Sequence, residues 1–117
     1  MSTDPNCIFC KIINKKIPAK IIHEDEHATA FEDLNPQAPV HTLIVPKKHI
    51  ADIHSMTITD RELIGHLFFI AKRIASDKGL DRGGYRMVIN NGLDAGQTVF
   101  HLHLHLLSGR IFSWPPG

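Results

Sequence analysis

Apolar residues recur at helical spacing over one long stretch of the chain. Behind Thr59 they fall on a single face of a helix that would run to Gly79. Thr59 and Glu62 match a capping box at its start, and glycine is a natural C-terminal stop. The pattern therefore predicts one long amphipathic helix. Its apolar stripe consists of Leu63, Leu67, Phe68, Ala71, Ile74 and Ala75.

The other regular segments are shorter. A helix is predicted from Asp4, because Pro5 is tolerated in a first turn and apolar residues then recur at helical spacing. The predicted strands are a hairpin of 21–25 and 27–34, a β-rich run at 42–45 that stops at Pro46, and an alternating strand at 85–90. Strands that join mostly through hairpins and short loops, with one helix inserted, indicate an α+β fold: an antiparallel sheet with helices on one face.

Composition restricts the class of protein. The 117 residues are enough for one domain, 1–117, and the apolar and charged fractions are those of an ordinary globular protein. A net charge of +1 argues against nucleic-acid or membrane partners held by bulk electrostatics. No window reaches the ~18 apolar residues of a membrane span and nothing marks secretion, so we expect a cytoplasmic location.

Three histidines alternate with leucines from His101 to His105. In a β-strand the side-chain period is two, so all three imidazoles would share one face while the leucines point into a core. Ordinary surface positions are one explanation, although a single strand seldom carries three side chains that titrate near neutral pH. Two chemical explanations remain. The imidazoles chelate a metal, or one of them is a nucleophile whose neighbours handle protons and charge.

This histidine pattern, followed by two more leucines, resembles the signature of the histidine-triad nucleotide-binding proteins. Four further segments resemble the family in the same order, at 31–41, 45–50, 84–90 and 95–100. The ending Trp114-Pro115-Pro116-Gly117 is similar to that of the Hint branch.

The resemblance implies a HIT-like fold, in which a five-stranded antiparallel sheet with one long and one short helix continues across a homodimer. It also implies a hydrolase that cleaves the P–N bond of purine nucleoside 5′-monophosphoramidates through a covalent nucleotidyl-histidine intermediate. Its partners would be purine nucleoside monophosphate derivatives.

The resemblance also implies roles for individual residues. His103, the middle histidine, corresponds to the nucleophile, because a neutral imidazole can attack phosphorus while its other nitrogen keeps a proton. His41 corresponds to a histidine that supports the triad strand from an adjacent strand. Asp33 corresponds to the carboxylate that accepts hydrogen bonds from the ribose hydroxyls, with a purely turn-forming aspartate as the alternative.

The remaining candidates surround the phosphate and the base. The expected phosphate ligands are His105, Thr98, Asn90 and the backbone amides from Gly96 through Gln97 to Thr98. Thr98 has a second possible role, donation to the leaving group. Leu34, with Phe9 and Ile12, would line a base pocket or belong to the core. His101 completes the catalytic set, and the Trp114 segment is expected to reach the neighbouring subunit's site.

Two cysteines, Cys7 and Cys10, form a C-x-x-C pair near the start of the chain. A redox dithiol normally follows a strand, which is absent from the pattern here, and packing as small apolar residues is the common alternative. Some triad proteins pair these cysteines with a histidine after two lysines and with the first triad histidine. Those positions are His49 and His101, so the resemblance implies a structural zinc with four ligands and no organic cofactor.

Two other functions compete with the phosphoramidate hydrolase. The histidine trio could bind the metal of a metal-dependent hydrolase, which chelators would inhibit. The chain could also be a nucleotide-binding regulatory module, with good binding and little turnover. The other histidines, His23, His27, His54 and His66, lie outside any motif and are interpreted as ordinary polar positions.

Overall fold

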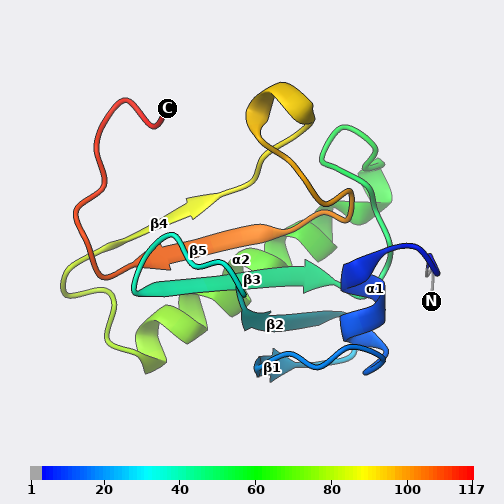
Figure 1. Cartoon of the computed structure of the whole chain (residues 1–117), viewed down its shortest axis with the longest axis horizontal. Helices are drawn as coiled ribbons and strands as arrows, with labels where there is room; N and C mark the ends of the chain where they lie inside the picture. The colour runs from blue at the N-terminus through cyan, green and yellow to red at the C-terminus, as the bar shows by residue number, and fades with distance from the viewer. Residues whose placement is uncertain (1–3) are drawn as a thin grey trace.

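One antiparallel sheet of five strands organises the molecule (Figure 1). The computed structural model describes residues 4–117. Its strands are β1 (Ile21–Glu24), β2 (Ala28–Glu32), β3 (Val40–Pro46), β4 (Tyr85–Val88) and β5 (Leu104–Ser108). They lie in the order β1-β2-β3-β5-β4, and each neighbouring pair is antiparallel. The predicted α+β fold is confirmed, with β3 longer and β4 shorter than the pattern suggested. The prediction that the helices share one face is wrong, because α1 and α2 pack on opposite faces of the sheet.

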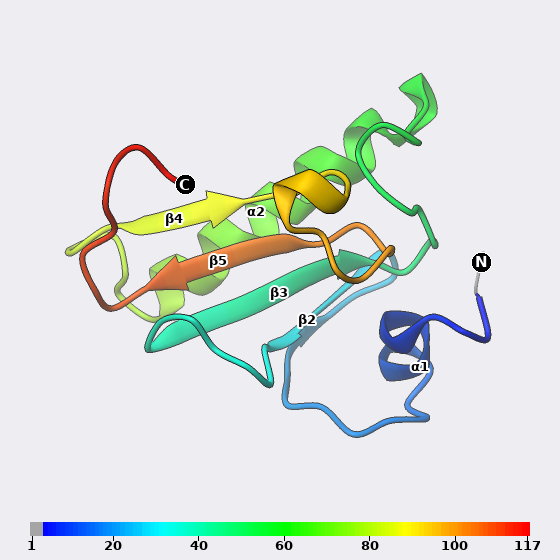
Figure 2. The same cartoon turned by 45° about the horizontal axis from the view of Figure 1, so that its top comes forward.

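The long helix α2 (Arg61–Asp77) covers one face of this sheet (Figure 2). Its buried stripe packs on apolar side chains such as Ile44 of β3 and Leu104 of β5. These side chains face the helix at alternate positions of the two strands. Each fully buried leucine or isoleucine contributes about 1.5–3 kcal/mol relative to an exposed one, so this layer supplies the main core. Phe68, predicted for the stripe, is 41% exposed, while Ile70 is buried in the core.

The start of α2 differs from the prediction. The capping box does not use Thr59 and Glu62; it lies at the short 3₁₀ helix η1 (Ile58–Asp60) that precedes α2. The backbone N–H of Thr57 donates to the Asp60 carboxylate over 2.9 Å. Lys48 also binds that carboxylate, at 2.7 Å, which fixes Asp60 at this position. The predicted end is confirmed, because Gly79 has a φ of +68° directly after the helix.

The first helix also begins later than the pattern predicts. Helix α1 (Ile8–Ile13) starts three residues beyond Pro5, because Asp4 forms a turn in which its carboxylate accepts the Asn6 N–H at 2.9 Å. Cys7 caps the helix, and its sulfur accepts the backbone N–H of Cys10 over 3.2 Å. A pattern of apolar residues does not reveal such a cap, since cysteine is not among the usual N-cap residues.

Helix α1 packs on the second face of the sheet, at one end only (Figure 1). Phe9 meets Phe31 of β2 edge to face, with ring centroids 5.4 Å apart. Leu43 and Val45 of β3 join the same cluster. The rest of this face remains outside α1, and it carries His41 and the end of the histidine run.

The histidine run is only partly a strand, which corrects the sequence interpretation. Strand β5 begins at Leu104, so His101 and His103 lie in the segment before it. The ladder ends there because β3 stops at Pro46, which has no N–H to donate, and because the N–H of Leu102 donates to Ile50 outside the sheet at 2.7 Å. The predicted shared face is nevertheless kept: the rings of His103 and His105 are 4.9 Å apart.

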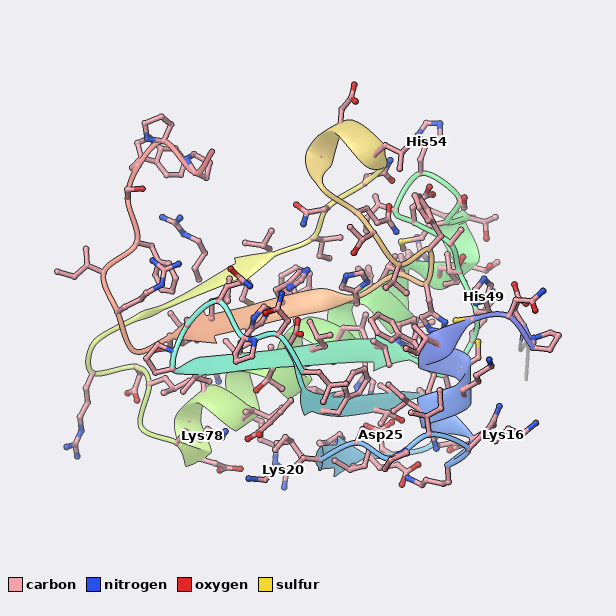
Figure 3. The ribbon with its side chains drawn as sticks, in the orientation of Figure 1. Lys16, Lys20, Asp25, His49, His54 and Lys78 are labelled. Atoms are coloured by element: carbon pink, nitrogen blue, oxygen red, sulfur yellow. The ribbon has the colours of Figure 1, made fainter. Side chains whose placement is uncertain are left out.

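Asp25, labelled in Figure 3, lies in the turn between β1 and β2 and bonds His66 of helix α2. One carboxylate oxygen accepts from His23 at 2.7 Å and from His66 at 2.8 Å. The other oxygen accepts the backbone N–H groups of His27 and Ala28. His66 therefore holds this turn to the helix and His23 holds it to β1, although the sequence left both as ordinary polar positions.

Within residues 4–117, no helix combines the length and the apolar character that crossing a membrane requires.

Candidate functional site

A cavity of about 410 Å³ opens on the face of the sheet that α1 covers. Helix α1 forms one end of it, the turn after β2 forms the rim, and the loop before His101 closes the far side. Among the predicted site residues, those that line it are Phe9, Ile12, Asp33, Leu34, His41, Gly96, Thr98, His103 and His105. The fold thus gathers most of the family-derived set around one opening.

His103 lies at the bottom of this cavity and is 8% exposed. Its Nδ1 is 2.7 Å from the backbone oxygen of His101. A carbonyl can only accept, so Nδ1 carries the proton and the lone pair of a neutral ring is on Nε2. Burial lowers the pKa of His103, although the His101 carbonyl and the Asp33 carboxylate oppose this. The ring is therefore neutral at neutral pH, with one unprotonated nitrogen.

His105 is held from the neighbouring strand β3. Its Nδ1 is 2.9 Å from Nε2 of His41, which is 7% exposed. His41 lies where the sequence predicted it, on the strand adjacent to the triad. Burial lowers the pKa of His41, and the nearby Asp33 opposes this shift. Burial also lowers the pKa of His105 to about 4, and its neighbours His103 and His41 add to this effect.

Asp33 forms the turn and also lines the cavity. One of its oxygens accepts the backbone N–H of Asn35 at 2.8 Å, which makes it a turn-forming aspartate. The other oxygen is 3.4 Å from Nε2 of His41, and the carboxyl group also lines the cavity. The turn therefore positions a carboxylate at the cavity without using all of its acceptor capacity.

The glycine loop provides fewer phosphate donors than the sequence suggested. The backbone N–H of Gly96 already donates to Leu93, and that of Gln97 donates to Gly92. The Gln97 side chain is 2% exposed, and its amide bonds Gly92, Ala51 and Val99 within the fold. Gln97 is therefore an internal brace of the loop, and Thr98 is the exposed polar residue that this loop contributes to the cavity.

Three other candidates lie away from the centre of the cavity. Leu34 is 81% exposed at the rim, so it covers the opening and does not belong to the core. Asn90 is half-buried and does not line the cavity. Trp114 is 82% exposed on the C-terminal segment, which runs past β4 and away from α1 (Figure 2). Phe112 anchors that segment, with the guanidinium of Arg110 4.3 Å from its ring centre.

The four predicted metal ligands come together beside this cavity. Cys7, Cys10, His49 and His101 place one ligand atom each within 4.8 Å of one another, and Figure 3 shows His49 next to α1. Nε2 of His101 is 2.7 Å from the carbonyl oxygen of Pro46, so it carries the proton and Nδ1 presents a lone pair to the cluster. Burial raises the pKa of Cys7 to about 11, opposed by the Cys10 N–H that donates to its sulfur.

The spacing of these atoms fits a tetrahedral cation. The two imidazole Nδ1 atoms are 3.1 Å apart, and three sulfur–nitrogen distances are 3.3 Å, 3.4 Å and 3.4 Å. At the usual zinc distances, two nitrogen ligands of a tetrahedron lie about 3.3 Å apart and a nitrogen and a sulfur about 3.6 Å apart, so the observed distances are only about 0.2–0.3 Å shorter. Two thiols and two imidazoles are also a usual donor set for structural zinc.

A larger opening, of about 800 Å³, lies on the α2 side of the molecule. Its lining includes Lys48 and Asp60, which pair with each other, and none of the triad histidines. The smaller cavity therefore holds the candidate chemistry.

Sequence reasoning did not identify which backbone groups orient the histidines. The carbonyls of Pro46 and His101 and the amide of Gln37 each bond one imidazole nitrogen. Residue types give no signal for such contacts, since any residue supplies the same backbone atoms. Of these residues, only Pro46 had a predicted structural role close to this one, as the end of a strand.

The comparisons with known proteins agree with this geometry. The family model described as the HIT domain matches residues 14–111. The chain belongs to this HIT family. It is 56% identical over 110 residues to an uncharacterized HIT-like protein of Synechocystis. The aligned region covers 94% of this chain and 96% of that protein.

Two solved structures show how far the HIT fold is shared. The HIT family hydrolase of Legionella pneumophila is 50% identical, with a TM-score of 0.93 over 96% of this chain and all of that one (100%). The histidine triad nucleotide-binding protein of Candida albicans is 33% identical, with a TM-score of 0.81 over 94% of this chain and 83% of that one.

The lowered pKa of His105 predicts a pH dependence of stability. Its usual pKa of 6.5 applies to the unfolded chain and about 4 to the folded one, so the unfolded state binds more protons between these values. The contribution of His105 is fully present above about pH 6.5 and is lost as the pH falls toward 4. The free energy of unfolding, from urea titrations at pH 7 and pH 5, should therefore fall more in the wild type than in His105→Gln. Equal falls in the two proteins would contradict this origin.

Proposed function

We propose that this HIT protein hydrolyses the P–N bond of purine nucleoside 5′-monophosphoramidates. The observation that carries the proposal is the hydrogen bond from Nδ1 of His103 to the carbonyl of His101. This bond leaves Nε2 of His103 unprotonated, with its lone pair available in the cavity. The names of the relatives support it at a coarser level: the Legionella protein is called a hydrolase and the Candida protein a nucleotide-binding protein.

The cavity accommodates the parts of such a substrate. The base would lie between the apolar side chains of α1, with Phe9 at the centre. The ribose hydroxyls would donate to the free oxygen of Asp33. His105 and Thr98 would bind the phosphate oxygens next to His103. The purine would need no charged partner in this part of the cavity, because contact with the apolar side chains is enough to accommodate its ring.

The reaction would proceed in two displacements at phosphorus. In the first, the lone pair of His103 Nε2 forms a bond to phosphorus while the P–N bond breaks, and the departing amine takes up one proton from solvent near Thr98. The His101 carbonyl stabilises the positive charge that the ring acquires. In the second, water attacks phosphorus, the electron pair returns to Nε2, and the water releases one proton. The products are the nucleoside monophosphate and the amine, so atoms and protons balance.

A metal-dependent hydrolase that uses the histidine trio fits the geometry less well. Two clusters of potential ligands occur among residues 4–117: one contains His101, the other His105, and neither contains His103. The three imidazoles therefore do not converge on one point. A regulatory module with little turnover would differ from the enzyme only in its rate, so a direct assay decides between them.

Replacing the nucleophile should abolish turnover while leaving nucleotide binding intact. For His103→Ala we expect hydrolysis of an adenosine 5′-monophosphate alkylamide to fall by at least about 10²–10⁴-fold, the range for losing a single acid–base group. AMP should still bind, as measured by calorimetry. His54→Ala, an exposed histidine outside the cavity, is the matched control and should keep its activity. Near-wild-type hydrolysis by His103→Ala would exclude the mechanism.

We further propose that Cys7, Cys10, His49 and His101 hold one structural zinc per subunit. The convergence and spacing of their donor atoms support this assignment. A site closed by four protein ligands has no open position for a reacting water, so the cation would supply stability and no chemistry. It would connect α1 to the segment that carries His103.

Elemental analysis of protein purified without chelator should give one zinc per chain. The double variant Cys7→Ala, Cys10→Ala should contain none, and a strong chelator should lower the melting temperature of the wild type only. Zinc at full occupancy in the double variant, or its absence from the wild type, would assign the cysteines to packing alone.

We also propose that the protein is a homodimer. Strand β4 is an edge of the sheet, and an edge strand offers backbone groups to a second strand. On the adjoining helix α2, Phe68 and Phe69 are 41% and 71% exposed, and Trp114 extends on the C-terminal segment beyond β4. Continuation of the sheet across β4 would cover these apolar side chains and bring Trp114 toward the partner.

Sedimentation velocity at micromolar concentration should therefore give the mass of two chains. Deletion of residues 113–117 should leave this mass unchanged and alter the kinetics of hydrolysis. A monomer in the first measurement would disprove the dimer, and unchanged kinetics in the second would remove the role of the tail.

A further inference from the structure

The fixed charges on the wall of the cavity are negative. Among residues 4–117, the charged side chains that line it are the carboxylates of Glu32 and Asp33, and no lysine or arginine lies in its wall. Sites that hold a phosphate by charge present lysine or arginine to it. A phosphate in this cavity meets carboxylates instead, so the number of its own charges affects how tightly it binds.

Asp33 lies close to the position proposed for the phosphate. Its Oδ2 is 3.4 Å from Nε2 of His41, and this Nε2 is in turn 2.9 Å from Nδ1 of His105. His41 is 7% exposed, so little water screens the space between the carboxylate and a phosphate beside His105. Charges separated by a few ångströms of buried protein interact more strongly than they do in water. The Asp33 carboxylate therefore repels each negative charge that is added at the phosphate.

The other titratable groups of the cavity do not offset this repulsion. They are Glu32, His41, His103 and His105. Burial lowers the pKa of His41, and it lowers the pKa of His105 to about 4, so these two rings are neutral at neutral pH. Glu32 is itself negative, and the ammonium of Lys20, 3.6 Å from its carboxylate, pairs with it from outside the cavity wall.

The loop before His101 adds few hydrogen-bond donors for a phosphate. The backbone N–H groups of Gly96 and Gln97 already donate within the loop. Thr98 contributes one hydroxyl. A dianionic phosphate has three strong acceptor oxygens. Its second charge is therefore poorly compensated at this end of the cavity.

The substrate and the product of the proposed reaction differ in charge at phosphorus. In a nucleoside 5′-monophosphoramidate, the nucleoside oxygen and the amine nitrogen leave only one ionisable oxygen, so the group carries a single negative charge. Hydrolysis replaces the nitrogen by a second ionisable oxygen, which has a pKa of about 6 in phosphate monoesters. At neutral pH the product therefore becomes mostly a dianion.

We infer that the cavity selects nucleosides whose 5′ phosphorus group carries one negative charge, because the Asp33 carboxylate repels a second one. The selection acts on binding and needs no turnover. Its consequence for catalysis rests on the proposed phosphoramidate hydrolysis: the hydroxyl that water adds to phosphorus releases its proton to solvent, and the resulting dianion leaves the cavity. Asp33 thus attracts one part of the nucleotide, the ribose hydroxyls, and repels another.

Calorimetric titration with two probes of similar shape tests the selection. Adenosine 5′-sulfate keeps one negative charge from pH 5.5 to 8, whereas AMP changes from mostly one charge to two. For the wild type, we expect the Kd of AMP to rise at least about 10-fold over this range relative to the Kd of the sulfate, because the singly charged fraction of AMP falls by more than that. Titration of protein groups affects both probes. An unchanged or falling ratio of the two Kd values, or no binding of either probe, would overturn the inference.

The variant Asp33→Asn tests the origin of the repulsion, because it removes the charge and keeps the size of the side chain. Any loss at the ribose weakens both probes alike, so the ratio of their Kd values reports the charge. The rise of this ratio between pH 5.5 and 8 should be smaller than in the wild type by about 3-fold or more. Asp81→Asn, the same change at an exposed position outside the cavity, is the matched control and should keep the wild-type rise. An equal rise in all three proteins would contradict the role of Asp33.

A second variant, Glu32→Gln, keeps the test decisive if Asp33→Asn binds neither probe. It removes the other carboxylate of the cavity wall. We expect a smaller reduction of the rise, because Lys20 already offsets part of this charge. A rise as large as in the wild type would contradict repulsion by the wall.

Product inhibition tests the consequence for catalysis. With the adenosine 5′-monophosphate alkylamide as substrate, the inhibition constant of AMP should rise between pH 5.5 and 8, relative to that of adenosine 5′-sulfate, by the same factor as its Kd. A constant ratio of the two inhibition constants would show that product release does not depend on the second charge. If the wild type hydrolyses no phosphoramidate, the proposed function fails, and calorimetry still decides the selection.

Discussion

The arrangement of the whole site depends on one hydrogen bond, from Nε2 of His101 to the carbonyl oxygen of Pro46. This bond turns the Nδ1 lone pair of His101 toward Cys7 and Cys10. It also holds the backbone of His101 where its own carbonyl accepts the proton of His103. One imidazole thus joins two sites: its ring belongs to the Cys/His cluster, and its peptide group bonds the ring of His103.

Backbone atoms assign the protonation sites of the histidines throughout this region. The carbonyl of Pro46, the carbonyl of His101 and the amide of Gln37 each contact one ring. Backbone groups cannot change their protonation, so tautomers fixed in this way do not depend on the titration of a neighbouring side chain. Burial acts in the same direction by lowering the pKa of His101, His103 and His105. The result is a cluster of imidazoles that are neutral at neutral pH yet individually oriented.

The sequence predicted the elements and the residue set better than the contacts. The apolar stripe of α2, the hairpin and the end at Gly79 follow from local periodicity and turn chemistry, which act over a few residues. The gathering of Cys7 and Cys10 with two distant histidines was implied by family resemblance, since nothing local connects residue 10 to residue 101. The capping box uses Asp60 and not the predicted Glu62, because Lys48, which is remote in sequence, binds the Asp60 carboxylate. The internal hydrogen bonds of Gln97 could not be predicted from the sequence either. A polar side chain beside a glycine loop can bond the loop itself or a ligand, and the sequence does not distinguish the two.

Helix α1 is only six residues long, far below the length at which an isolated helix is stable in water. Its attachment to the sheet therefore depends on tertiary contacts: Phe9 on Phe31 and His103, and the two cysteines on His101. Because the helix is short and depends on these few contacts, we expect α1, the end wall of the cavity, to open locally while the sheet stays intact. Amide hydrogens of this helix would then exchange in a separate cooperative unit, faster than those of β3 and β5. The two cysteines do not line the cavity, so their contacts with His101 hold this wall from outside it.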